Sequence, residues 1–117
     1  MQDLKQRTFH FAVNTGKLIQ ALPYNTVNKA YSAQLIRCSS SVGANYRAAC
    51  RAKSPADFIY KLKIVEEETD ETMFWLEILE ESNLIKYERI KLVKLELNEI
   101  LAIVVSSIKT VKAKIGR

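Results

Sequence analysis

The chain has 117 residues, a formal net charge of +5, and 48% apolar and 26% charged residues. This composition fits one globular domain and is too apolar for a disordered chain. Three glycines and two prolines are too few for a sheet protein with many tight turns, and they favour long helices. No apolar run approaches the ~18 residues needed to cross a bilayer, and the N-terminus lacks the apolar core of a signal peptide. We therefore expect a cytoplasmic protein with no membrane partner.

Charge is distributed unevenly along the chain. Residues 1–54 carry eight basic groups and one acidic group, residues 55–81 carry two and nine, and residues 82–117 carry eight and three. The acidic block can fold against its basic neighbours. Alternatively, part of the basic surface stays free for an anionic partner.

The prolines and one polar break divide the first half of the chain into two expected helices. The first spans about residues 3–22, before Pro23, and places Phe11 and Leu18 on one side. The second spans about residues 25–53, with Asn25 or Thr26 as its N-cap.

The second half has the clearest helix start in the sequence. Ser54 can cap a helix of residues 55–82, Pro55 suits its first position, and Asp57 follows three residues after the cap. A fourth helix spans about residues 87–114, because apolar residues recur there every three or four positions. Such short connections predict one all-α domain of residues 1–117, an antiparallel up-down-up-down four-helix bundle.

The third helix carries two apolar stripes. One, from Phe58 to Leu76, is the expected core face. A second stripe on the opposite side suggests an interface between subunits of a homo-oligomer, because a monomeric bundle should be polar there. Its residues are Tyr60, Ile64, Glu67, Glu71, Phe74, Trp75 and Ile78. The alternative is that the first helix or the chain ends cover this face.

Basic residues gather on two other faces, and we take them as candidate nucleic-acid contacts. They are Lys29, Arg37, Arg47 and Arg51 on the second helix, and Lys91, Lys94, Lys109 and Lys112 on the fourth. Alternatively, Arg37 pairs with Glu67 or Glu71 across the turn. Folding the chain back at the turn near residue 54 places Arg37 level with about Glu71, but it places Arg47 level with Lys61. Arg47 is therefore the more available anion contact.

Small residues around Gly43 continue the second helix and do not form a loop. A helical glycine costs ~1 kcal/mol relative to alanine, so Gly43 predicts close approach of a neighbouring helix. Cys38 and Cys50 are ~18 Å apart on one helix, too far for a disulfide, and we expect both to be buried.

The sequence contains few residues that could form a catalytic or metal site. A di-iron site needs carboxylates from several helices and two Glu-x-x-His motifs, but the only histidine is His10 and the first two expected helices offer only Asp3. The serines at 39–41 lack the base of a catalytic triad, and there is no glycine-rich phosphate loop. We expect no enzyme activity and no cofactor.

One segment resembles a known protein family. It combines S-V-G-A-N at 41–45, Arg51 before the turn at Ser54, and an acidic run leading to W-L-E at 75–77. Residues 39–85 resemble bacterial four-helix-bundle proteins first noticed as reading frames in 23S rRNA intervening sequences. The same fold occurs in accessory variability proteins of diversity-generating retroelements, which form homopentamers and are thought to bind nucleic acid and a reverse transcriptase. The resemblance implies a homo-oligomer, a pentamer.

Two functional hypotheses follow. The first is an oligomeric bundle that binds RNA or DNA through basic faces without strong sequence specificity. The second is a protein-interaction scaffold or accessory subunit, whose surface recruits an acidic partner or a reverse transcriptase.

Overall fold

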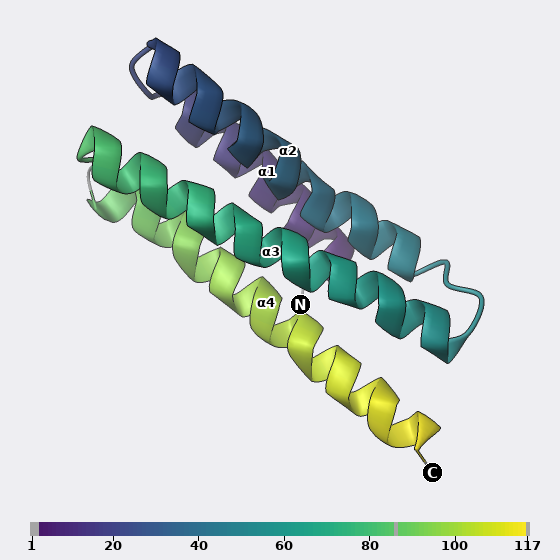
Figure 1. Cartoon of the computed structure of the whole chain (residues 1–117). Helices are drawn as coiled ribbons and strands as arrows, with labels where there is room; N and C mark the ends of the chain where they lie inside the picture. The colour runs from purple at the N-terminus through teal and green to yellow at the C-terminus, as the bar shows by residue number, and fades with distance from the viewer. Residues whose placement is uncertain (1–2, 86, 117) are drawn as a thin grey trace.

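A computed structural model describes residues 3–85 and 87–116, and its regular elements are four α-helices (Figure 1). They are α1 (Leu4–Gln20), α2 (Thr26–Ala49), α3 (Pro55–Asn83) and α4 (Tyr87–Ile115). The described residues contain no strand. The prediction of an all-α chain with four helices is therefore confirmed.

The helices form an elongated bundle of 52 × 24 × 20 Å. The chain reverses direction at each connection, and successive helices lie side by side (Figure 1). α1 also packs against α4, which closes the bundle, whereas neither diagonal pair is in contact. Each helix therefore keeps an outer face that the other helices leave uncovered.

Side-chain caps fix where three of the helices begin. Asp3 accepts a hydrogen bond from the backbone N–H of Gln6, Asn25 from that of Asn28, and Ser54 from that of Asp57. These bonds satisfy backbone donors that the first helical turn leaves unpaired.

The ends of the first two helices differ from the predicted ones. α2 ends at Ala49 and not at Lys53, because the residues around 51–54 form the turn that leads into α3. α1 ends at Gln20 and not at residue 22, because the ring of Pro23 disfavours helical backbone at the residue before it.

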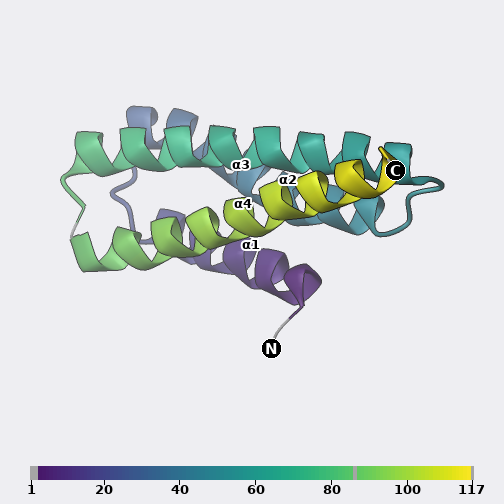
Figure 2. The same cartoon turned by 90° about the horizontal axis from the view of Figure 1, so that it is seen from below.

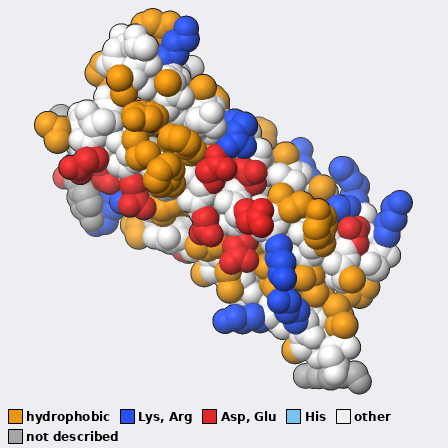
Figure 3. Space-filling model, in the orientation of Figure 1, with side chains coloured by type: hydrophobic (Ala, Val, Ile, Leu, Met, Phe, Trp, Pro, Cys, Tyr) orange, Lys and Arg blue, Asp and Glu red, His pale blue; other side chains and the backbone are white. Residues whose placement is uncertain are grey.

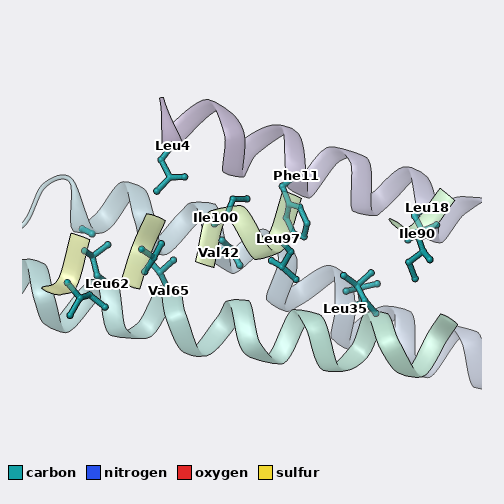
Figure 4. Packing of buried hydrophobic residues seen from close by; sticks show 14 of the residues in the cluster. Leu4, Phe11, Leu18, Leu35, Val42, Leu62, Val65, Ile90, Leu97 and Ile100 are labelled. Carbon is teal, nitrogen blue, oxygen red and sulfur yellow. The ribbon is translucent and has the colours of Figure 1, made fainter. Parts of the chain in front are cut away.

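The core runs along the centre of the bundle and receives side chains from all four helices (Figure 4). The fully buried members are mostly leucine, isoleucine and valine, with Phe11 contributed by α1. The predicted core stripe of α3 is buried at Leu62, Val65 and Leu76, with Thr69 and Thr72 between them. Each buried threonine hydroxyl donates to the backbone carbonyl four residues earlier, so neither is left unsatisfied.

α1 is the shortest helix and leaves one end of the bundle open. The N-terminal end of α1 and the C-terminal half of α4 diverge (Figure 2). Beyond α1 lies a groove of about 460 Å³, where Phe58 on α3 faces Val111 and Ile115 on α4. The short first helix thus leaves apolar surface uncovered on the longer helices.

Candidate nucleic-acid interface

The predicted basic cluster of α2 is divided between two sides of the helix. Arg37 turns toward α3, where it forms ion pairs with Glu71 and, at 3.6 Å, with Glu68. Glu71 also accepts a hydrogen bond from Nε1 of Trp75 at 3.1 Å. The partners are Glu71 and Glu68 and not Glu67, and they leave Arg37 a weaker candidate for phosphate than predicted.

Glu68 is the less satisfied of the two carboxylates. Its Oε2 is buried and accepts no hydrogen bond from the described residues, and the Arg37 guanidinium lies 3.6 Å away. Burial raises the pKa of Glu68, and the positive charge of Arg37 opposes this shift. Arg37 therefore stabilises the negative charge of Glu68, a partly buried carboxylate on α3.

The basic residues of α4 also have different environments. Lys94 forms an ion pair with Glu80 on α3 at 3.1 Å, whereas Lys109 and Lys112 are exposed near the C-terminal end. Lys112 lies beside Lys63 of α3, and this positive neighbour lowers the pKa of Lys112. The sequence did not single out Lys63, because its importance depends on the packing of α3 against α4.

The side of the molecule formed by α1 and α2 contains no acidic residue in either helix. Lys29, Arg47 and Arg51 are exposed there, and none pairs with a carboxylate in the described part of the chain. Asp57, at the start of α3, accepts hydrogen bonds from Lys61 and from the backbone N–H of Lys53, and it forms no ion pair with Arg51. The prediction that Arg47 stays available agrees with this geometry.

An aromatic ring accompanies Arg47. Its guanidinium lies 6.0 Å from the centroid of the Phe9 ring, and Phe9 is 53% exposed. No pattern in the sequence predicts a role for Phe9, because it lies off the core stripe of α1. A large aromatic residue outside the core stripe is the signal that could have identified it.

The predicted interface stripe of α3 is partly exposed. Tyr60 and Phe74 are 66% and 55% exposed, Glu67 is exposed, and Ile64 and Ile78 are half-buried. α1 does not contact α3, so the alternative that the first helix covers this face is wrong. Figure 3 shows acidic side chains gathered over the middle of α3, with hydrophobic side chains on both sides.

Two members of this stripe have contacts within the chain. Glu71 pairs with Arg37, and Trp75 packs its ring against Tyr31 of α2 at 5.8 Å between centroids. Both residues therefore contribute to the packing of α2 on α3, and only the rest of the stripe is open to a partner.

The described residues also bear on the expectations for metal sites, cysteines and membrane spans. No group of three or more His, Cys, Asp or Glu side chains among them could hold a metal ion. Both cysteines are free, Cys38 is buried, and Cys50 is exposed at the end of α2, so the expectation of two buried cysteines is wrong for Cys50. None of the described helices is long and apolar enough to cross a membrane.

Comparison with known proteins agrees with the bundle. A sequence model of the family described as 23S rRNA-intervening sequence protein matches residues 2–106. A similar solved structure is a protein of unknown function from the S23 ribosomal protein family of Bacteroides thetaiotaomicron, with 36% sequence identity and a TM-score of 0.80. The alignment covers 92% of this chain and 99% of that one. No curated protein matches the chain.

Proposed function

We propose that this chain, which belongs to the family of 23S rRNA-intervening sequence proteins, is a non-enzymatic bundle that binds nucleic acid through its basic surface. Binding would use the phosphate backbone without strong sequence preference, in the cytoplasm. No base-reading motif accompanies the lysines and arginines, which supports this mode.

The observation that carries the proposal is the charge of α1 and α2. Neither helix contains an aspartate or a glutamate, so a polyanion lying along them meets no carboxylate from either. Lys29 and Arg47 lie eighteen residues apart on α2, which is about five helical turns, so both project from the same side. This surface can contact phosphates over ~27 Å.

A second basic position lies on α3 and α4, at the end of the bundle where α2 ends and α3 begins. Lys63 lies close enough to Lys112 to lower the pKa of Lys112. A phosphate placed between them would replace repulsion with two attractive contacts. Lys109, one helical turn before Lys112, adds a third exposed charge.

The salt dependence of binding tests the proposal. Fluorescence anisotropy with labelled RNA and DNA, single-stranded and double-stranded, should show binding at low salt that weakens steeply toward physiological salt. Similar affinities for unrelated sequences of one strandedness are expected. Absence of binding at low salt, where phosphate contacts are strongest, would refute the function.

We also propose that the protein is a homo-oligomer, and the resemblance to retroelement accessory proteins favours a pentamer. The open part of the α3 stripe would form the contact, with Tyr60, Ile64, Phe74 and Ile78 as its apolar residues. Repetition of the basic surface around a ring would strengthen phosphate binding, because each site after the first binds within the same assembly.

A protein-interaction scaffold is the second candidate. The exposed rings of Tyr60 and Phe74 beside acidic residues of α3 support it, since such a surface suits another protein better than a polyanion. The partner would be an acidic protein or a reverse transcriptase that contacts the basic helices as well as this face of α3. Pull-down with and without nuclease separates the two candidates, because a direct protein partner survives nuclease treatment.

A further inference from the structure

Four residues near the N-terminal end of α1 form a compact surface feature that the basic surface alone does not explain. Lys5, Phe9 and His10 of α1 and Arg47 of α2 line adjoining hollows of about 230 and about 300 Å³. We call these residues the Phe9 cluster. Lys5, Phe9 and Arg47 line both hollows, so they are the centre of the feature.

The Phe9 ring is largely available to a ligand. It is 53% exposed although it lies beside the close contact of α1 with α2. The Arg47 guanidinium lies 6.0 Å from its centroid, and the His10 ring meets it edge-on at 5.6 Å. An exposed aromatic ring with a cation already near it offers a surface on which another flat ring can stack.

The charges of the cluster complement an anion. Lys5 and Arg47 are exposed and form no ion pair in the part of the chain that the structure describes. Arg7, two residues after Lys5 on α1, points elsewhere and pairs with Glu96 of α4. Two unpaired cations therefore flank an exposed aromatic ring.

We propose that the Phe9 cluster is a stacking site for one unpaired base of a single-stranded nucleic acid, with Lys5 and Arg47 binding the adjoining phosphate. The inference rests on the proposed nucleic-acid function and deepens it. Base stacking on aromatic side chains accepts every base, which agrees with binding that lacks sequence preference. An aliphatic side chain from another protein would use the ring and leave both cations unpaired.

The site predicts a preference for single strands that contain bases. A labelled 12-nucleotide oligothymidylate should bind more tightly than an abasic strand with the same number of phosphates. Phe9→Ala and Phe9→Leu should weaken oligothymidylate binding about 5- to 100-fold and leave abasic binding within about twofold. Phe9→Tyr should retain the affinity, because the stacking ring remains.

Two further variants separate stacking from charge. Arg47→Ala should weaken binding of both strands and reduce the salt slope by about one. Val13→Ala is the matched control, since Val13 is an exposed apolar residue of α1 outside the cluster, and it should change neither affinity.

The outcomes distinguish failure of this inference from failure of the function. No binding of any nucleic acid by the wild type overturns both. Binding of the abasic and thymidine strands with equal affinity, or an unchanged affinity for Phe9→Leu, overturns the stacking site alone. A third result would also overturn the stacking site. If Phe9→Ala lowered the mass measured by light scattering and left the oligothymidylate affinity per subunit unchanged, the Phe9 cluster would be a contact between subunits.

Discussion

Gly43 of α2 lies directly against Thr8 of α1: a Cβ added at Gly43 would be 3.0 Å from Oγ1 and 3.2 Å from Cβ of Thr8. The Thr8 hydroxyl is fixed, because it donates to the Leu4 carbonyl oxygen at 2.8 Å. This contact confirms that the small residues of α2 allow a neighbouring helix to approach. It also anchors the part of α1 that carries the Phe9 cluster.

Gly43 and Gly16 provide a matched pair for testing the contact. Both are helical, but a Cβ at Gly16 would meet nothing within 4 Å. We expect Gly16→Ala to stabilise the fold by about 0.5–1 kcal/mol through helix propensity. Gly43→Ala should lose this gain to steric overlap with Thr8, so its unfolding free energy should be at least about 1 kcal/mol below that of Gly16→Ala.

Urea denaturation of both variants measures this difference. Thr8→Ala removes the nearest oxygen, so the penalty at Gly43 should shrink in the double variant. Equal stabilisation by Gly16→Ala and Gly43→Ala would show that the helices separate easily at this point.

The α3 stripe can be tested by placing a charge on it. Phe74 is 55% exposed in the single chain, and Phe74→Glu should dissociate the proposed oligomer because it buries an unpaired charge at the subunit contact. Val27→Glu is the control, since Val27 is 54% exposed in the first turn of α2 and gains the same charge. Light scattering should show a lower mass for Phe74→Glu alone, and an unchanged mass would contradict the proposed interface.

Arg37 and Arg47 should separate stability from nucleic-acid binding. Arg37→Ala should destabilise the fold by about 0.2–1 kcal/mol, because Arg37 pairs with Glu71 at a partly exposed site. It should change the affinity for nucleic acid less than Arg47→Ala does. Arg47→Ala should leave thermal stability nearly unchanged and reduce the salt slope of binding by about one. Melting curves and anisotropy measure the two effects. If Arg47→Ala lowered stability and Arg37→Ala weakened binding more, the two arginines would not have the separate roles proposed here.

Sequence periodicity was sufficient for the helices and most of the core. The stripe from Leu62 to Leu76 depends only on a spacing of three or four residues, and Ser54-Pro55 marks a helix start by local chemistry. Such features involve one helix at a time. They can therefore be predicted without knowing how the helices pack.

The candidate site could be predicted only in part, because it depends on contacts between helices. A projection of α2 places Arg37 and Arg47 on one broad face, but their long side chains reach different neighbours, Glu71 on α3 and Phe9 on α1. Lys63 becomes notable only beside Lys112. These pairings follow from the order of helices around the bundle, which determines the residues that each outer face meets.

The start of α3 should depend on pH through Asp57. This carboxylate accepts hydrogen bonds from the Lys53 backbone N–H and from Nζ of Lys61, both at 3.1 Å, and these bonds lower the pKa of Asp57. Because the folded pKa lies below the unfolded value of about 3.9, the stabilisation is present at neutral pH and is lost as the pH falls through the folded pKa. Asp57→Asn should therefore lower the melting temperature at pH 7, and the difference from wild type should shrink as the pH falls below about 4. Asp70→Asn is the control, since Asp70 is an exposed carboxylate of α3 with no ion pair among the described residues. If the melting temperature of Asp57→Asn stayed equally far below that of the wild type as the pH fell, the loss would come from the shape of the side chain and not from its charge.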